Sequence, residues 1–384
     1  MKPSTPVKLL AAVCFAASLS ITSCKKGELI QLPLPIKSND KVFKSAIFKQ
    51  KLQEQLVGAR GYQFVITHKG QVSDTAAFGI GSVNGDRSSV NAFVNIASVT
   101  KTLTAITALK YLDAFSIDNE IGPWLPSSWN RHADVRKLTF RQLLTHTSGI
   151  RGSGTSWSSL ISTAGAKIDS PKTYAYSNIN FALFRAMIPK LHDSITFRNQ
   201  EYDLGTTAFQ SWMSGEYIRL VQAYVISRSG IGQRGCAPVA GRTFQMLNEA
   251  PSRLNGVSHT DWTEFCGGGG FVLTTMDMSR VITYLAEKDI ILSDNKKLLM
   301  DTYRLGWNRV FPVEGGMAYG HGGALYSDVN QSDSLDVGDV GLQTLIMKFP
   351  ARVQLALSIN SVDSTWRNTS GIVKAAFDAA WVKE

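Results

Sequence analysis

A serine and a lysine one helical turn apart constrain this sequence more than any other feature. Two residues separate Ser98 from Lys101, and the apolar residues that follow recur at three- and four-residue spacing: Leu103, Ala105, Ile106, Ala108, Leu109 and Leu112. This spacing predicts an amphipathic helix that begins at Ser98 and carries both polar side chains on one face. A serine beside a desolvated amine can lose its proton, and a helix N-terminus favours the negative charge that develops. Ser98 is therefore a candidate nucleophile.

The Ser-x-x-Lys spacing needs support from the rest of the chain. The same spacing begins at Ser23, Ser38 and Ser293, but only at Ser98 does it open a long helical pattern. The alternative interpretation of one such match is a serine at a helix start followed by a solvated lysine. A catalytic interpretation therefore depends on further residues in the appropriate order.

The first 23 residues have the pattern of an export signal. Lys2 and Lys8 are the only charged residues, and the apolar run 9–21 is too short to span a bilayer comfortably. The four residues that end at Cys24 resemble a bacterial lipobox, in which the cysteine is acylated after cleavage. We therefore predict a lipoprotein signal peptide over 1–23 and lipidation of Cys24.

Lipid chains on Cys24 would anchor a soluble domain to a membrane, because each buried methylene contributes roughly 0.8 kcal/mol. Residues 24–40 contain Pro33 and Pro35 and little periodicity, which predicts a tether. The expected location is the cell envelope, with the domain facing the periplasm or the outside. Plain secretion, with Cys24 as a bystander, is the alternative.

The composition is typical of one globular envelope protein. Hydrophobic residues make up 44% and charged residues 18%, so residues 41–384 can form a large core. Loss of the signal lowers the formal charge from +10 to +8, because it removes two lysines and no acid. No basic run suggests nucleic-acid binding, and we expect a monomer. Cys236 and Cys266 either form a disulfide or remain as buried thiols.

Five runs in the sequence predict strands, two early and three late: 62–68, 72–78, 318–326, 341–349 and 352–361. The segment 98–317 between them is mainly helical in pattern. The two ends of the chain, 41–97 and 318–384, are therefore expected to share one sheet in an α/β (α+β) part of a single domain.

Two further clusters follow Ser98 and Lys101. Tyr176-Ser177-Asn178 lies at a predicted helix start, and Tyr319-Gly320-His321-Gly322-Gly323 opens the first late strand. Together these segments resemble the serine beta-lactamase and penicillin-binding-protein superfamily, in the branch with Tyr-x-Asn as its second element. That branch includes class C beta-lactamases, DD-peptidases, D-aminopeptidases and family VIII esterases.

The resemblance extends from about residue 42 to the C-terminus. Leu143–Ile150 is similar to the Leu-Leu-Thr-His-Thr-Ser-Gly segment of this branch. Gly269–Asp277 is similar to its Gly-Gly-x-x-Ser-Thr-x-x-Asp segment, with Leu273 where serine is usual. The implied fold is beta-lactamase/transpeptidase-like, with a five-stranded antiparallel sheet flanked by helices, an all-helical region and the site in the cleft between them.

The resemblance also implies roles for individual residues. Ser98 attacks a carbonyl to form an acyl-enzyme, and Lys101 is the neutral base or hydrogen-bond partner. Tyr176 relays protons if nearby cations depress its pKa. Asn178 holds Lys101 and the substrate. We assign His146 to structural support of the loop near the site.

The remaining implied residues belong to the late strand. The backbone N–H groups of Ser98 and Ala324 would form an oxyanion hole. Gly322 and Gly323 would let a substrate lie along the strand edge, and His321 would contact the substrate. We expect no metal or cofactor, because the sequence contains no His-Glu-x-x-His, no paired Cys-x-x-Cys and no P-loop.

The main departure from the family pattern is His321, where beta-lactamases and most penicillin-binding proteins carry lysine. A lysine supplies a permanent cation for the substrate carboxylate, whereas a histidine near pH 7 is mostly neutral. This difference weakens the case for an efficient beta-lactamase. The acidic insert 327–339 either borders the cleft and disfavours anionic substrates or is a solvated loop.

The expected activity is hydrolysis of an amide or ester through an acyl-enzyme, with short acyl esters or D-amino-acid peptides as substrates. Two alternatives stay open. One is a true beta-lactamase or DD-carboxypeptidase. The other is a catalytically silent relative that binds an envelope component.

Overall fold

An eight-stranded antiparallel sheet is the centre of the fold in the computed structural model, which describes residues 40–248, 254–327, 339–361 and 368–383. The strands of this sheet are β2 (Gly61–His68), β3 (Gln71–Gly79), β5 (Met246–Leu247), β6 (Gly256–Val257), β8 (Arg309–Val313), β9 (Gly316–Ser327), β10 (Val340–Phe349) and β11 (Val353–Ile359). The order β3-β2-β11-β10 continues from β10 to β9 and β8, and β5 and β6 extend it at one end of β10. The two ends of the chain therefore share one sheet.

All five predicted strands are present, as β2, β3, β9, β10 and β11, and the antiparallel arrangement is confirmed. The count of five was too low. The sequence pattern missed β8, which contains Pro312, and β5 and β6, which are two residues long. Such strands carry no alternation long enough to recognise.

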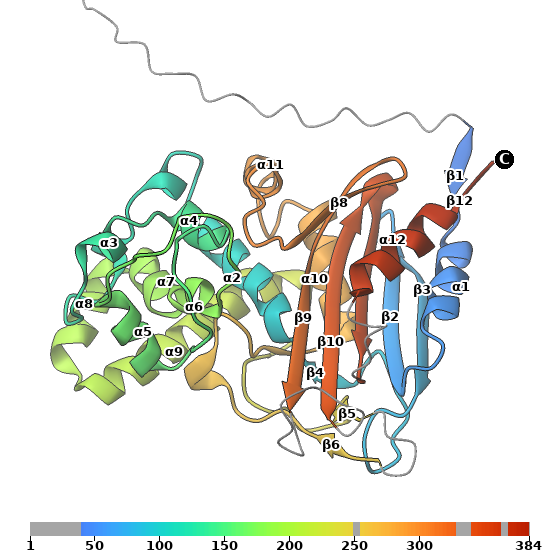
Figure 1. The fold of residues 1–384 in the computed structure, drawn as a ribbon, viewed down its shortest axis with the longest axis horizontal. Coiled ribbons are helices and arrows are strands. Elements are labelled where there is room, and N and C mark those ends of the chain that lie inside the picture. The colour runs from blue at the N-terminus through green and yellow to red at the C-terminus, as the bar shows by residue number, and fades with distance from the viewer. Residues whose placement is uncertain (1–39, 249–253, 328–338, 362–367, 384) are drawn as a thin grey trace, which may run out of the picture. The chain divides into compact units, whose positions relative to one another are not determined.

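Successive side chains along a strand point to opposite faces of the sheet, and both faces are buried. Leu345 and Met347 of β10 belong to one hydrophobic cluster, whereas Ile346 belongs to another. Helices α1 (Ser45–Gln55) and α12 (Thr369–Ala379) pack over the first face, and α10 (Thr275–Glu287) packs over the second (Figure 1). Both faces are apolar because helices cover both.

The helices between β4 and β5 form the mainly helical part beside the sheet (Figure 1). They are α2 (Thr100–Leu109), α3 (Ala133–Arg136), α4 (Phe140–Leu144), α5 (Trp157–Ala164), α6 (Asn178–Ala182), α7 (Phe184–His192), α8 (Ser194–Asp203) and α9 (Thr206–Val221). Helix α11 (Asp294–Thr302) lies later in the chain and has Ser293 at its N-cap position. The Ser-x-x-Lys sequence that begins at Ser293 is thus a helix start, and it lies on a different helix from the one that follows Ser98.

Two short pairings complete the described fold. Strand β1 (Lys41–Phe43) pairs with β12 (Trp381–Lys383), which joins the two ends of the domain. Strand β4 (Phe93–Asn95) pairs with β7 (Val272–Thr274). The chain runs from β4 directly into the turn before α2. Among the described residues, no helix combines the length and the apolar character that a bilayer crossing requires.

Cys236 and Cys266 form a disulfide that encloses a loop with a sequence separation of 30. The bond joins the segment after α9 to the glycine run at 267–270. The disulfide is one of the two alternatives that the sequence left open.

Candidate active site

A cavity of about 390 Å³ lies where α2, α6 and β9 meet. Six of the residues that line it were singled out from the sequence: Ser98, Tyr176, Asn178, Gly322, Gly323 and Ala324. Segments more than 200 residues apart in the chain therefore contribute to one hollow. Cys24, the predicted lipidation site, and most of the acidic insert lie outside the described residues.

A strained turn places Ser98 at the start of α2. Ala97 has a φ of 48°, in the left-handed region that costs a residue with a Cβ about 1–2 kcal/mol. The Asn95 side chain stabilises this turn by accepting a hydrogen bond from the Ala97 amide at 2.9 Å. The Thr344 hydroxyl of β10 donates to the Ile96 carbonyl at 2.8 Å and ties the turn to the sheet. Strain held in this way is typical of functional sites.

The side chain of Lys101 is fully buried beside Ser98. Its Nζ donates hydrogen bonds to Ser98 Oγ at 2.9 Å and to Asn178 Oδ1 at 2.8 Å, and it also contacts the Gly268 carbonyl oxygen. An ammonium group has three hydrogens for these acceptors, whereas a neutral amine has two and a free lone pair. In the neutral state Lys101 can therefore keep Asn178 and Gly268 as acceptors and take the proton of Ser98.

Burial lowers the pKa of Lys101 well below its ordinary value of 10.5. The cause is desolvation of the ammonium form, and no carboxylate among the described residues offsets it by pairing with Lys101. Desolvation therefore favours the neutral amine over the ammonium form. A base of this kind is what Ser98 requires for activation.

Tyr176 lies over the same pair. The Lys101 nitrogen is 4.8 Å from the centre of the Tyr176 ring, and the Tyr176 hydroxyl interacts with the Ser98 side chain. Burial raises the pKa of Tyr176 to about 12, although hydrogen bonding to Ser98 and the charge of Arg309 act in the opposite direction. The condition set for proton relay, a pKa depressed by nearby cations, is not met, because desolvation outweighs the charge of Arg309. Tyr176 is a neutral phenol in the resting site and can donate a proton.

The edge of β9 supplies backbone donors. The Gly322 amide donates to Asn308 Oδ1 at 3.0 Å, on the side of β9 away from β10. Amides of alternate residues in a strand point to the same side, so the Ala324 N–H points the same way. Pairing of β9 with β8 ends at Gly320, which leaves this stretch of the edge facing the cavity. The Ala324 and Ser98 amides can together receive the oxygen of a carbonyl.

His321 is buried next to Gly322 and Tyr176, two residues that line the cavity. Its side chain is 1% exposed, it does not line the cavity, and Nδ1 lies 2.7 Å from the Gly322 carbonyl oxygen. Burial, reinforced by the positive charge of Lys101, lowers the pKa of His321 well below its ordinary value. The ring of His321 lies 6.4 Å from the ring of Tyr176, and a contact between His321 and substrate stays a prediction.

The ring of His146 packs against the ring of Tyr176. The two rings are 4.5 Å apart, and His146 Nδ1 accepts hydrogen bonds from the Ser177 amide at 3.3 Å and from Asn180 Nδ2 at 3.2 Å. Burial and the charge of Lys101 lower the pKa of His146 to about 3, so the ring is neutral and can act as an acceptor. This arrangement fits the structural role expected for His146.

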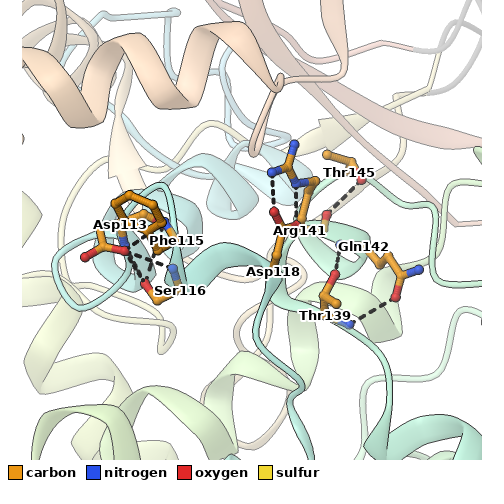
Figure 2. Close-up of polar contacts among 8 residues, drawn as sticks. All are labelled: Asp113, Phe115, Ser116, Asp118, Thr139, Arg141, Gln142 and Thr145. Carbon is orange, nitrogen blue, oxygen red and sulfur yellow. Dashed lines mark hydrogen bonds and ion pairs between the residues drawn. The ribbon is translucent and has the colours of Figure 1, made fainter. Parts of the chain in front are cut away.

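The loop that carries His146 begins at a well-anchored helix, α4 (Figure 2). Thr139 and Gln142 form a reciprocal capping box at its start, with distances of 3.2 and 3.0 Å. Arg141 binds both carboxylate oxygens of Asp118 and accepts a hydrogen bond from Thr145 through its carbonyl group. Such caps and paired contacts fix the exit of α4, which immediately precedes His146.

Several contributors to the site were not recognised in the sequence, among them Gly268, Tyr174 and Arg309. Gly268 provides the carbonyl that contacts Lys101, and Tyr174 and Arg309 line the cavity. The glycine run at 267–270 was a detectable signal for the first. Arg309 had none, because its position depends on the pairing of β8 with β9.

The fold is of the beta-lactamase/transpeptidase type, with an antiparallel sheet, covering helices and a helical part beside it. The chain belongs to the beta-lactamase family, since the sequence model of the family described as Beta-lactamase matches residues 48–332. No curated protein sequence matches the chain.

Solved structures of this fold include several hydrolases and penicillin-binding-protein homologues. An octameric penicillin-binding protein homologue from Pyrococcus abyssi is 18% identical, with a TM-score of 0.63 over 86% of this chain and 75% of that chain. A D-stereospecific amidohydrolase from Streptomyces sp. is 20% identical, with a TM-score of 0.60 over 87% and 98%. EstCE1, a hydrolase with promiscuous acyltransferase activity, is 13% identical, with a TM-score of 0.60 over 87% and 99%. At these identities the likeness establishes the fold alone.

Proposed function

We propose that this protein is a serine hydrolase that cleaves an ester or amide through an acyl-enzyme on Ser98. The observation that carries the proposal is the hydrogen bond of 2.9 Å between Ser98 Oγ and the buried nitrogen of Lys101. A lysine buried without a carboxylate partner among the described residues is costly to a fold unless its neutral form is used.

In the proposed mechanism, neutral Lys101 accepts the Ser98 proton as Oγ attacks the substrate carbonyl carbon. The carbonyl oxygen becomes an anion bound by the amides of Ser98 and Ala324, an arrangement that typically contributes a few kcal/mol to the transition state. The phenol of Tyr176 then donates its proton to the leaving alcohol or amine, and the Lys101 ammonium returns a proton to Tyr176. An ester between Ser98 and the acyl group remains.

Deacylation uses the same groups with water in place of the leaving group. Neutral Lys101, directly or through Tyr176, takes a proton from the water as its oxygen attacks the acyl carbon. Ser98 regains a proton when the ester bond breaks, and the acid is released. Asn178 keeps Lys101 in position throughout, because its Oδ1 accepts a hydrogen bond from Nζ in either charge state.

We propose short acyl esters or D-amino-acid peptides as the substrates. The D-stereospecific amidohydrolase and the hydrolase EstCE1 among the solved structures of this fold support this choice. Burial disfavours the cationic form of His321, which argues against efficient hydrolysis of beta-lactams that carry a carboxylate. A panel of a chromogenic cephalosporin, p-nitrophenyl acetate and butyrate, and D-alanyl dipeptides separates these activities.

Covalent labelling with a fluorophosphonate serine probe tests the proposal. The wild-type protein is expected to gain one adduct and Ser98→Ala none. The chain offers a matched control in Ser293→Ala, since Ser293 also begins a Ser-x-x-Lys helix start but lies on α11. Loss of labelling in Ser293→Ala would make Ser293 the reacting serine and refute the role of Ser98. Failure of the folded wild type to label and to turn over any ester or peptide would favour a silent envelope-binding relative.

The N-terminal segment supports a location in the cell envelope, with a lipid anchor on Cys24 and a tether over 24–40. The hydrolase would act there as a monomer on small acyl substrates, without a nucleic-acid partner. Cys24→Ser is expected to move the protein from the membrane fraction to the soluble fraction. An unchanged membrane fraction in Cys24→Ser would refute the anchor.

A further inference from the structure

Three successive backbone carbonyl groups, those of 266–268, each accept a hydrogen bond from a buried side chain. In sequence order the donors are Arg185 Nη1 of α7 at 2.8 Å, Thr104 Oγ1 of α2 at 2.7 Å and Lys101 Nζ of α2. All three donor side chains are 0% exposed. Lys101 belongs to the proposed active site, whereas Arg185 and Thr104 have no part in the proposed mechanism and do not line the cavity at Ser98. We refer to 266–268 as the carbonyl segment.

Arg185 is a fully buried cation that bonds to backbone oxygens. Its Nη1 and Nη2 donate to the carbonyl groups of Cys266 and Thr155, both at 2.8 Å, and its guanidinium carbon lies 4.2 Å from the centre of the Trp157 ring. Burial lowers the pKa of Arg185 to about 10, although the charge of Glu264 acts in the opposite direction. Because it is costly to desolvate a cation, an arginine buried in this way indicates that the backbone it holds must be placed accurately.

The titratable groups that face Arg185 are Glu264 and Tyr217. Glu264 Oε2 accepts a hydrogen bond from Ser214 Oγ of α9 at 3.0 Å. The hydroxyl of Tyr217, also on α9, shares a hydrogen bond of 2.7 Å with Thr104 Oγ1. The two donors that precede Lys101 in the row, Arg185 and Thr104, are therefore both held against α9.

Close packing against α6 also restricts the carbonyl segment. A Cβ atom on Gly268 would lie 2.8 Å from the Asn178 carbonyl oxygen, and one on Gly267 would lie 3.1 Å from the Phe181 carbonyl oxygen. The backbone of the segment thus contacts the helix whose Asn178 side chain binds Lys101. The disulfide at the start of the segment adds a covalent link. The Gly268 oxygen therefore has little freedom to move away from Lys101.

The position of the Gly268 oxygen matters because of the way in which Lys101 shares its hydrogens. The ammonium form has three, for Ser98, Asn178 and Gly268. The neutral amine has two, and when Asn178 and Gly268 accept both, its lone pair points to Ser98 Oγ. A displaced Gly268 oxygen would let the amine turn its lone pair away from Ser98. It would also leave one hydrogen of the ammonium form buried without an acceptor.

We infer that Arg185 and Thr104 are positioning residues that act on Lys101 through the carbonyl segment: they hold the Gly268 oxygen where it directs the lone pair of neutral Lys101 to Ser98. The inference rests on the proposed acyl-enzyme function and adds the residues that orient its base.

Loss of either donor should change the rate and the pH profile together. A poorly oriented base lowers the plateau of kcat/KM about tenfold. A hydrogen bond to the ammonium form favours that form, so a displaced Gly268 oxygen should lower the pKa of Lys101 and move the acid limb to lower pH. Burial raises the pKa of neighbouring Tyr176 to about 12. Burial and the charge of Lys101 lower the pKa of His146 to about 3 and that of His321 well below its ordinary value.

The profile of kcat/KM against pH for p-nitrophenyl acetate tests the inference in two variants. Thr104→Val removes the hydroxyl and keeps the shape of the side chain, and Arg185→Lys keeps the charge but cannot donate to both carbonyl groups. Both should show the lower plateau and the acid limb at lower pH. Thr107→Val is the matched control, because Thr107 is also buried on α2 and donates to the Leu103 carbonyl of that helix at 2.8 Å. Phe197→Leu, in the core at α8, controls for a general loss of stability. Both controls should keep the acid limb of the wild type.

A second measurement reads Lys101 without turnover. Lys101 is titrated by NMR in Ser98→Ala protein labelled with 13C-lysine, and its signal is assigned by its absence when Lys101→Met is added. The addition of Arg185→Lys or Thr104→Val should lower the pKa of Lys101, whereas Thr107→Val should not change it. This titration also distinguishes Lys101 from Tyr176 and the two histidines as the source of the acid limb.

An acid limb and a Lys101 pKa that stay unchanged in both variants, or that move upward, would overturn the inference and leave Arg185 and Thr104 as structural residues. A shift in Arg185→Met that is absent in Arg185→Lys would assign the effect to charge and overturn it as well. A thermal melt identifies the folded variants, and Thr104→Val decides the outcome if Arg185→Lys does not fold. Failure of the acyl-enzyme proposal alone would instead appear as an unlabelled, inactive wild type in which Thr104→Val still lowers the pKa of Lys101.

Discussion

Gly323 lies so close to Ser98 that a Cβ atom on it would be 2.9 Å from the Ser98 amide nitrogen. The same atom would meet Thr344 Oγ1 at 2.5 Å and the Ile96 carbonyl oxygen at 2.7 Å. Strand β9 and the turn before α2 are therefore in contact through backbone atoms. This contact brings the two amides of the proposed oxyanion hole, on Ser98 and Ala324, to one place.

We predict that Gly323→Ala lowers kcat on the order of a hundredfold, because displacement of β9 from Ser98 separates the two amide donors. Activity assays with p-nitrophenyl acetate and a thermal melt measure this effect. Gly215→Ala is the control, since Gly215, like Gly323, has no positive φ and a Cβ on it would meet no atom within 4 Å. Equal activity of Gly323→Ala and the wild type would show that the close approach is not required.

The lowered pKa of Lys101 predicts the pH dependence of kcat/KM. Protonated Lys101 cannot accept the Ser98 proton, so activity should fall as the pH drops through the lowered pKa of Lys101 and reach a plateau above it. Lys101→Met should abolish this activity. The control Lys110→Met, which changes the lysine directly after the end of α2, should retain it. An acid limb that persists in an active Lys101→Met protein would contradict the role of Lys101 as the base.

Asn178→Asp should move that acid limb to higher pH. The substitution places a carboxylate where the Asn178 Oδ1 now lies, 2.8 Å from Lys101 Nζ, and an opposite charge at this distance raises the pKa of the amine. The pH profile of kcat/KM for Asn178→Asp, compared with Asn178→Ala, measures the shift. An unchanged acid limb in Asn178→Asp would mean that the limb belongs to another group.

His146→Leu should lower kcat about tenfold with a small effect on KM. The neutral ring packs on Tyr176 and accepts the Ser177 amide, so its loss lets the Tyr176 phenol drift from Ser98. The pH profile separates this role from acid–base catalysis: the profile of His146→Leu should keep the shape of the wild type. A profile that loses a limb would instead make His146 a proton-transfer group.

Removal of the disulfide should destabilise the fold and weaken catalysis together. Cross-links of this loop length typically contribute about 2–4 kcal/mol to the free energy of unfolding. Cys266 is also two residues before Gly268, whose carbonyl contacts Lys101. Denaturant unfolding and ester hydrolysis of Cys236→Ser with Cys266→Ser measure both effects. A reductant should reproduce them in the wild type and have no effect on the double variant.

The parts of the molecule that local spacing determines were predictable from the sequence. Ser98 lies in a short 3-10 turn and Lys101 one turn later in α2, as the Ser-x-x-Lys spacing predicted, and Tyr176 and Asn178 flank a helix start. The prediction that this helix begins at Ser98 and is amphipathic was wrong, because α2 begins at Thr100 and is buried on all sides between the helical part and the sheet. The long alternating strands were also recognisable, whereas β8, with Pro312 and little alternation, was not.

The parts that depend on tertiary pairing were not predictable. Arg309 reaches the cavity because β8 pairs with β9 and because Gly322 has no side chain. His321 pairs with Ile346 of β10, whose side chain belongs to the hydrophobic cluster shared with α10 and the helical part. The alternation of side chains along a strand places His321 and its sequence neighbours on opposite faces of the sheet. It does not tell which of these faces the helical part covers, so the burial of His321 could not be predicted.

The most direct test of the account is to locate the acyl group during turnover. The wild-type protein is mixed with p-nitrophenyl acetate, quenched in acid and digested, and the peptides are analysed by mass spectrometry. We predict an acetyl group on Ser98 and on no other serine, including Ser293. Turnover that continues in Ser98→Ala, or an acetyl group on a different residue, would contradict the mechanism.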